Sequence, residues 1–142
     1  MKDLKTFLLD NSSNAPKNDK IFTVIKPGFE NLVETIESIF KKYGYKVYQM
    51  KTKRLLLSEA KELYKIHKKE KFYDDLCKYM SSGITIAYIL QKKSEDIFEE
   101  FSELKDKIRK DYGESNMRNV LHSSDSYENM INEASIYFNC FK

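Results

Sequence analysis

Glycine and proline are scarce in this chain of 142 residues, which has four glycines and two prolines. At average usage a chain of this length would contain roughly ten glycines and seven prolines. The two closest glycines, Gly28 and Gly44, are sixteen positions apart. This spacing excludes the glycine-rich dinucleotide fingerprint, the Walker A loop and the glycine loop of protein kinases, which all need closely spaced glycines. A phosphate-binding site in this chain cannot be built on any of these loops.

Histidine and cysteine are also scarce, with two of each. His67 and His122 are far apart, and Cys77 and Cys140 are separated by 63 positions, so the chain has neither a zincin helix nor paired cysteine ligands for zinc. Two distant cysteines are too few for a disulfide framework, and the first twenty residues lack the long apolar region of a signal peptide. No stretch approaches the ~20 apolar residues of a membrane span. We therefore expect free thiols, a cytoplasmic location, no membrane partner and no metal-ligating residues.

Arginine is the rare cation of this chain. The net charge is +3, from 25 lysines and arginines against 22 acidic residues, and only Arg54, Arg109 and Arg118 are arginines. The signs are interleaved apart from lysines around residues 65–71, and no RNA-binding aromatic motif is present, so we expect no nucleic-acid partner. Arginine suits phosphate oxygens, and two of the three arginines lie within thirteen residues before His122. This favours a phosphate site there; the alternative for both arginines is a surface position at a helix end.

The apolar periodicity predicts one α+β domain over residues 21–142, after a polar and mobile extension over residues 1–20. Strands are predicted over residues 21–25, 45–56, 84–90 and 119–122. Helices are predicted over residues 30–43, 58–67, 72–80, 94–112 and 126–138, with starts at Ser58, Ser94 and either Asp125 or Ser126, and with Gly44 ending the first. The order favours a ferredoxin-like sandwich, in which helices pack on one face of a four-stranded antiparallel sheet.

His122 stands at the end of the last predicted strand, before the segment SSDS and a predicted helix. A histidine held at a sheet edge near helix N-terminal amides can act as a nucleophile or an acid–base group. The structural alternative is that His122 is a partly buried strand residue and that residues 124–126 only cap the helix. His67 lies in a lysine-rich helix, where we expect it to pack or to face solvent.

The octet NVLHSSDS, which begins at Asn119, closely resembles the active-site signature of nucleoside diphosphate kinases, N-x-x-H-(G/A)-S-D. Supporting matches extend over most of residues 21–138. They comprise the segment IKP at Lys26, residues 46–51 followed by residues 63–64 and 68–73, the turn YMSSG before the third strand, and the segment IRKDYG. Arg109 stands at the family's own spacing from His122. Glu133, eleven positions after His122, falls where the family keeps a carboxylate.

The resemblance implies a nucleoside diphosphate kinase that transfers the γ-phosphate of ATP in a ping-pong reaction through a phosphohistidine on His122. Glu133 would orient the ring, and Lys26 would neutralise phosphate charge. The implied catalytic residues are His122, Glu133 and Lys26. The implied nucleotide-binding residues are Lys26, Tyr64, Phe72, Arg109 and Asn119, supported by Ser124 and Asp125. The implied cofactor is Mg²⁺, the partners are ATP and nucleoside diphosphates, and a homo-oligomer is expected.

Three of these residues would bind the nucleoside and the transferred group. Phe72 would stack on the base with little discrimination between bases, Asn119 would hold the sugar hydroxyls, and Tyr64 would hydrogen-bond near the transferred phosphoryl group. Without the resemblance, both aromatic residues would be interpreted as core or rim side chains.

Two segments depart from the family pattern. The segment KPGF after the first strand is shorter than the family's form, and the stretch between Gly83 and Arg109 is several residues shorter than in typical members. The family's G-x-T-N-P loop and its upstream arginine are not recognisable, and a continuous helix is predicted instead, with Lys105 and Lys107 as the only substitute cations. The alternative function is therefore a catalytically weakened relative that acts as a nucleotide-binding or protein-interaction module.

Overall fold

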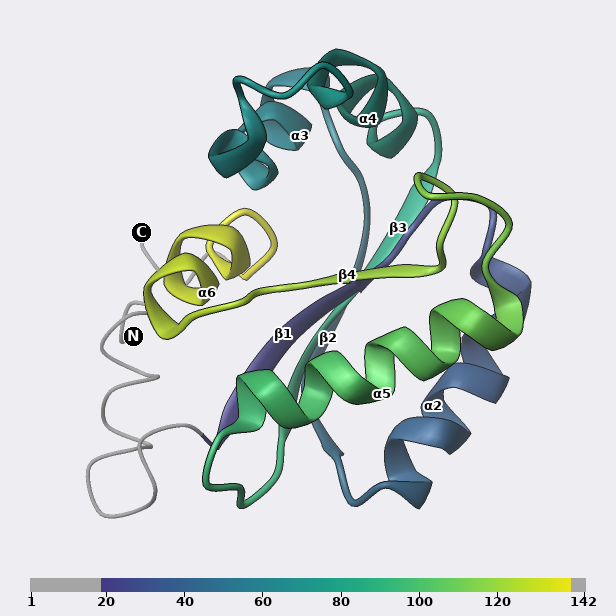
Figure 1. Ribbon diagram of the computed structural model, residues 1–142, viewed down its shortest axis with the longest axis vertical. Helices are drawn as coiled ribbons and strands as arrows, with labels where there is room; N and C mark the ends of the chain where they lie inside the picture. The colour runs from purple at the N-terminus through teal and green to yellow at the C-terminus, as the bar shows by residue number, and fades with distance from the viewer. Residues whose placement is uncertain (1–18, 139–142) are drawn as a thin grey trace.

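Four antiparallel strands form the sheet at the centre of the computed structural model, which describes residues 19–138 (Figure 1). The strands are β1 (Lys20–Ile25), β2 (Lys46–Arg54), β3 (Ile84–Gln91) and β4 (Leu121–Ser123). Their order across the sheet is β2-β3-β1-β4. The predicted antiparallel sheet is therefore confirmed, although β4 begins two residues later than expected because Val120 has a φ of +80°, outside the β region.

Helices occupy the predicted parts of the chain. They are η1 (Glu30–Leu32), α2 (Val33–Lys42), α3 (Leu57–Leu63), η2 (Lys65–His67), α4 (Tyr73–Met80), α5 (Ile97–Tyr112) and α6 (Tyr127–Ala134). Gly44 follows α2 with a φ of +89°, the left-handed conformation expected of a glycine that ends a helix. The final helix is shorter than predicted and stops at Ala134.

Two of the predicted helix starts were wrong. α5 is capped by Asp96, whose carboxylate accepts a hydrogen bond from the amide of Glu99 at 3.2 Å, whereas the hydroxyl of Ser94 accepts one from the amide of Asp96. α3 begins at Leu57, before Ser58, and the amide of Leu56 donates to Glu59 at 2.9 Å. At the start of each of these two helices a carboxylate, and not the predicted serine, accepts the hydrogen bond. The carboxylate of Asp96 accepts from a free amide in the first turn of α5, and that of Glu59 accepts from the backbone N–H just before α3.

The helices cover both faces of the sheet, which corrects the expectation of helices on one face only. Side chains of β1 alternate between two cores: Phe22 and Val24 pack with residues of α3, α4 and α6, and Ile21 and Ile25 pack with residues of α2 and α5. Figure 1 shows these two groups of helices on opposite sides of the strands. Because β1 is buried on both faces, residues 21–25 are apolar except for Thr23 and do not alternate with polar residues.

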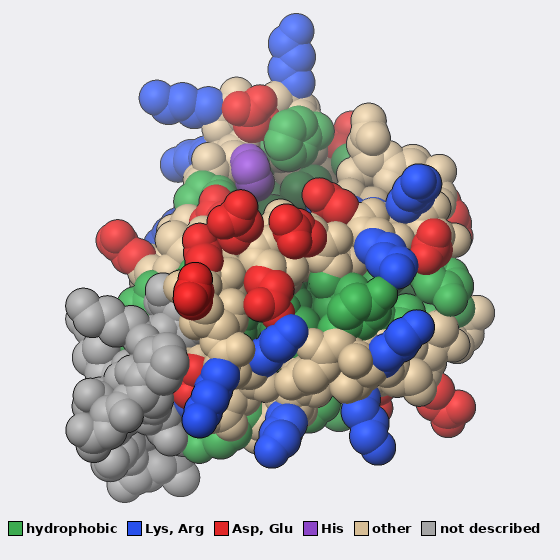
Figure 2. Space-filling view, turned by 60° about the horizontal axis from the view of Figure 1, so that its bottom comes forward, with side chains coloured by type: hydrophobic (Ala, Val, Ile, Leu, Met, Phe, Trp, Pro, Cys, Tyr) green, Lys and Arg blue, Asp and Glu red, His purple; other side chains and the backbone are tan. Residues whose placement is uncertain are grey.

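Charged side chains of both signs lie on the face shown in Figure 2, as the interleaved sequence suggests. None of the helices between residues 19 and 138 is long and apolar enough to cross a membrane.

The pairing of β1 with β4 positions the residues that the sequence analysis singled out. Val24 lies opposite His122 in this antiparallel pair, and the amide of Lys26 donates to the carbonyl of Val120 at 2.8 Å. Lys26, which follows β1, is thus brought next to His122, although the two are distant in the sequence.

Candidate active site

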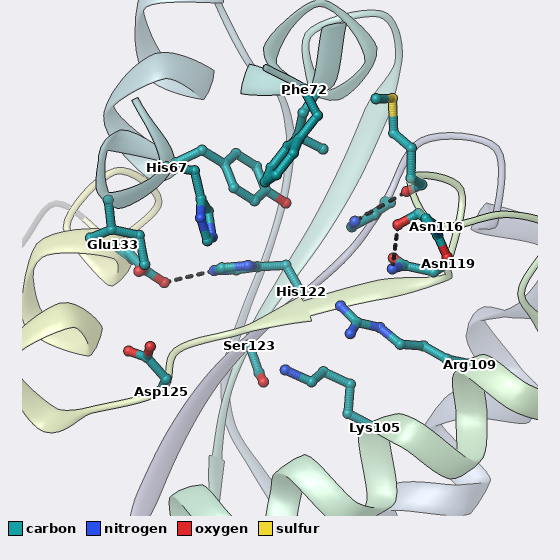
Figure 3. A pocket seen from close by; sticks show the side chains of 15 residues that line it. His67, Phe72, Lys105, Arg109, Asn116, Asn119, His122, Ser123, Asp125 and Glu133 are labelled. Atoms are coloured by element: carbon teal, nitrogen blue, oxygen red, sulfur yellow. Dashed lines mark hydrogen bonds and ion pairs between the residues drawn. The ribbon is translucent and has the colours of Figure 1, made fainter. Parts of the chain in front are cut away.

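A cavity of about 580 Å³ contains eight of the nine predicted site residues (Figure 3). The eight residues in its wall are Lys26, Tyr64, Phe72, Arg109, Asn119, His122, Asp125 and Glu133. The ninth, Ser124, lines a neighbouring cavity and donates a hydrogen bond to Glu133. The residues come from the end of β1, from β4 and its flanking loops, from α5 and α6, and from the α3–α4 region. The fold therefore brings together residues that are far apart in the sequence.

His122 is held by a carboxylate. Its Nε2 lies 2.7 Å from Oε1 of Glu133, which also accepts a hydrogen bond from the hydroxyl of Ser124 at 2.8 Å. Because a carboxylate only accepts hydrogen bonds, Nε2 carries the hydrogen and the lone pair of a neutral ring lies on Nδ1. Nδ1 has no hydrogen-bond partner between residues 19 and 138. This arrangement leaves a nucleophilic nitrogen available for reaction.

Burial keeps the ring of His122 neutral. His122 is 9% exposed, and burial lowers the pKa of the imidazole, with Lys26 and Lys105 adding to the effect and Glu133 opposing it. A neutral imidazole is the nucleophilic form, so the surroundings favour the reactive state near neutral pH.

Three cations converge on the cavity from β1 and α5. Lys26 is buried and donates to the carbonyl of Met117 at 3.2 Å, and burial followed by repulsion from Arg109 and Lys105 lowers its pKa to about 7. Arg109 donates from Nη2 to the carbonyl of Leu121 at 2.8 Å, while its buried Nε has no hydrogen-bond acceptor in the part of the chain that the structure describes. Cations that repel one another in a partly dry site are stabilised by a multivalent anion such as a phosphate chain.

Aromatic rings line the other side of the cavity. The ring of Tyr64 meets that of His122 edge-on with a centroid distance of 5.0 Å, and its buried hydroxyl has no hydrogen-bond partner among residues 19–138. Phe72 is 44% exposed at the rim, and its ring lies 5.5 Å from that of His67. Figure 3 shows Phe72 and His67 across the cavity from Lys105 and Arg109. An exposed ring opposite a group of cations suits a ligand with a flat base at one end and phosphates at the other.

Asn119 precedes β4 in a strained turn. Its Nδ2 donates to the carbonyl of Asn116 at 2.8 Å, and its buried Oδ1 accepts no hydrogen bond from any described residue. The next residue, Val120, has a φ of +80°, which is costly for a β-branched residue and is concentrated in proteins at functional sites. The turn therefore presents an acceptor that a ligand hydroxyl could satisfy.

His67 was missed by the sequence analysis, which expected it to pack or to face solvent. It lies in η2 and lines the cavity beside Phe72. The fold of the region from α3 to α4 brings it there, and no local pattern in the sequence carries that information.

Of the two candidate substitute cations, only Lys105 lines the cavity. Lys107 turns away and donates to the hydroxyl of Tyr43 at 2.7 Å. Arg118 also lies outside the cavity, where its guanidinium pairs with Glu114 at 2.8 Å and stacks over Phe29. The surface alternative was therefore the right one for Arg118, whereas Arg109 lies in the cavity.

Comparison with known proteins agrees with the signature around His122. A model of the nucleoside diphosphate kinase family matches residues 19–142. The chain belongs to the nucleoside diphosphate kinase family. The expected enzyme class is thereby confirmed.

Individual nucleoside diphosphate kinases resemble this chain over most of their length. The nucleoside diphosphate kinase of Chlorobaculum tepidum is 30% identical over 132 residues, which cover 84% of this chain and 93% of that protein. The nucleoside diphosphate kinase of Flavobacterium psychrophilum is 33% identical over 84% of this chain and 94% of its own. A crystal structure of the Aquifex aeolicus nucleoside diphosphate kinase superposes with a TM-score of 0.73 at 26% identity, covering 83% and 93% of the two chains. The ferredoxin-like fold is therefore confirmed.

Proposed function

We propose that this chain transfers the γ-phosphate of ATP to nucleoside diphosphates through a phosphohistidine on His122. The observation that carries the proposal is the 2.7 Å contact between Nε2 of His122 and Glu133 inside the cavity, which leaves Nδ1 as the nucleophile. Membership of the nucleoside diphosphate kinase family supports it.

The reaction has two balanced halves. In the first, the lone pair of Nδ1 attacks the γ-phosphorus, an N–P bond forms, and the bond to the β–γ bridging oxygen breaks so that ADP leaves. In the second, a terminal oxygen of a nucleoside diphosphate attacks the same phosphorus, and the N–P electrons return to Nδ1. Glu133 retains its hydrogen bond to Nε2 throughout and stabilises the positive charge that the ring gains.

The remaining site residues position the phosphates and the nucleoside. Lys26 and Arg109 neutralise phosphate charge, which is the main contribution that a protein makes to phosphoryl transfer. The unpaired hydroxyl of Tyr64 donates to a phosphoryl oxygen, and the unpaired Oδ1 of Asn119 accepts from a sugar hydroxyl. Phe72 stacks on the base at the rim.

The donor set of the cavity fits Mg²⁺ carried on the nucleotide. Mg²⁺ prefers one or two carboxylates together with water and substrate phosphates to an all-protein cage. Between residues 19 and 138 no three His, Cys, Asp or Glu side chains are grouped to hold an ion, while the carboxylate of Asp125 is exposed at the wall of the cavity. Asp125 would hold the hydrated ion from the protein side. When bound, the ion would supply further neutralisation of phosphate charge.

In this proposal the catalytic domain spans residues 21–142, and residues 1–20 form an extension. Residues 1–18 and 139–142 lie outside the described part of the chain. The proposal includes a cytoplasmic location, supported by the two widely separated cysteines. It also includes a homo-oligomer formed at β2, the edge strand of the sheet, where Val47 and Met50 are each 48% exposed.

The test is labelling with radioactive ATP and Mg²⁺. We expect the protein to acquire an acid-labile, base-stable phosphate that is absent from His122→Ala and is chased by GDP or dTDP. Circular dichroism shows whether the variant is folded. Folded wild-type protein that binds nucleotide without taking the label would refute the proposal and support the alternative of a binding module.

A further inference from the structure

Lys105 and Arg109 lie one turn apart on α5. Both line the cavity, and Figure 3 shows both side chains directed from α5 towards His122, on the side opposite Phe72. Residues four apart on a helix lie on the same face, so α5 presents two cations to one ligand. The next apolar positions of the helix, Leu104 and Ile108, are buried in the core and fix the direction of this face.

The ammonium of Lys105 is not directly paired within the described part of the chain. No hydrogen bond or ion pair joins it to any residue between 19 and 138, whereas Lys107, two residues further on, donates to Tyr43. Lys105 is only partly exposed, and burial followed by repulsion from Arg109 lowers its pKa, although the carboxylates of Asp106, Asp125 and Glu133 act in the opposite direction. A ligand anion that paired directly with this ammonium and with Arg109 would stabilise both cations.

Lys105 also marks one end of the cavity. With Ser123 and Asp125 it forms part of both the nucleotide cavity and a neighbouring cavity of about 540 Å³. A nucleotide whose base stacks on Phe72 and whose phosphates pass His122 therefore runs towards Lys105. In this orientation the phosphates, which carry the negative charge of the nucleotide, would lie beside the ammonium of Lys105.

We propose that Lys105 binds the phosphate chain of the nucleotide together with Arg109. This inference rests on the proposed function, since it concerns the same site. Residues 97–108, which lie before Arg109 in α5, contain no arginine, threonine or glycine that could bind a phosphate. Binding by Lys105 would supply a phosphate contact from this helix.

The experiment compares ADP affinity in wild-type protein, Lys105→Met, Lys105→Arg and the matched control Lys107→Met. Methionine keeps the length of the stem and removes only the charge. We expect Lys105→Met to raise the Kd for ADP about tenfold or more, the effect of losing one charge-assisted hydrogen bond. Lys105→Arg should restore most of the affinity, and Lys107→Met should bind like wild type.

Two outcomes separate this inference from the proposed function. If the wild type becomes phosphorylated on His122 while Lys105→Met binds ADP as tightly as Lys107→Met, the inference is wrong and the proposed function stands. If the wild type neither binds ADP nor takes the phosphate label, both are wrong. Thermal unfolding of the three variants shows whether a loss of affinity reflects a damaged fold, and a loss that Lys105→Arg does not restore also counts against the inference.

Discussion

Oε1 of Glu133 accepts two hydrogen bonds, from Nε2 of His122 at 2.7 Å and from the hydroxyl of Ser124 at 2.8 Å. One oxygen is thus fixed from two sides, and the imidazole is fixed through it. The contact joins α6 to β4, so the orientation of the ring depends on how the last helix docks on the sheet. Ser124 contributes to the chemistry by positioning the carboxylate, without reaching the cavity itself.

Replacing Glu133 by glutamine tests this arrangement. The amide keeps the shape but loses the charge that stabilises a positive ring, so we expect the rate of phosphohistidine formation to fall by about 10²-fold. Single-turnover labelling with excess protein measures that step. Glu128→Gln, an exposed change on the same helix, is the control and should react at the wild-type rate. Equal rates for the two variants would show that the carboxylate does not assist the ring.

The pH dependence of the reaction should have two limbs. Below the lowered pKa of His122 the ring is protonated and cannot attack, so activity should rise with pH in the range below 6.5. Lys26, with a pKa of about 7, loses its charge above neutral pH in the free enzyme, so kcat/KM should fall there. Bound phosphates raise that pKa, and the alkaline limb of kcat should lie at higher pH.

Lys26→Arg provides the control for that assignment, because arginine stays protonated throughout this range. Its profile should keep the acid limb and lose the alkaline one. An alkaline limb near pH 7 that persists in Lys26→Arg would have to come from another group.

Much of this fold follows from local patterns. The sequence predicts the buried strand β1 from its apolar residues and the helix α5 from its helical periodicity. It also predicts the contact between His122 and Glu133 from their spacing in a motif. The sequence also indicates which of Lys105 and Lys107 lines the cavity, since of these two lysines Lys105 is the one that shares a helix face with Arg109.

The rest depends on contacts between distant segments. The position of His67 in the cavity depends on how α3 and α4 pack over the sheet. The residues next to His67 in the sequence do not predict this packing. The conformation of Val120 is imposed by the turn between α5 and β4, where its carbonyl binds the amide of Lys26. Local propensity predicts a strand at a valine, so the start of β4 was predicted two residues too early.

Phe72 offers a test of how the base is bound. Stacking accepts any base, so Phe72→Ala should weaken the binding of ADP and GDP by a similar factor of about ten. Fluorescent nucleotide displacement measures both affinities, and Phe72→Tyr should bind nearly as well as wild type. Tyr112→Ala removes another exposed ring, one that lies outside the cavity, and should have no effect. A loss confined to one nucleotide would indicate hydrogen-bonded recognition of the base instead of stacking.

The buried charge of Lys26 should reduce the stability of the protein in the absence of ligand. Its pKa falls from 10.5 to about 7 on folding, mainly through burial, so the unfolded chain binds the proton more tightly than the folded one. The resulting penalty is fully present below pH 7 and diminishes as the pH rises from 7 towards 10.5.

Lys26→Met should therefore raise the Tm by about 3 °C or more at pH 6.5, in spite of the lost hydrogen bond to Met117. The gain should be smaller at pH 9, and phosphorylation of His122 should be strongly reduced. Thermal unfolding at the two pH values measures the effect, with Lys107→Met as the control for removing an exposed charge. A lower Tm for Lys26→Met at pH 6.5 would show that the lysine stabilises the fold and is not held there at a cost for binding phosphate.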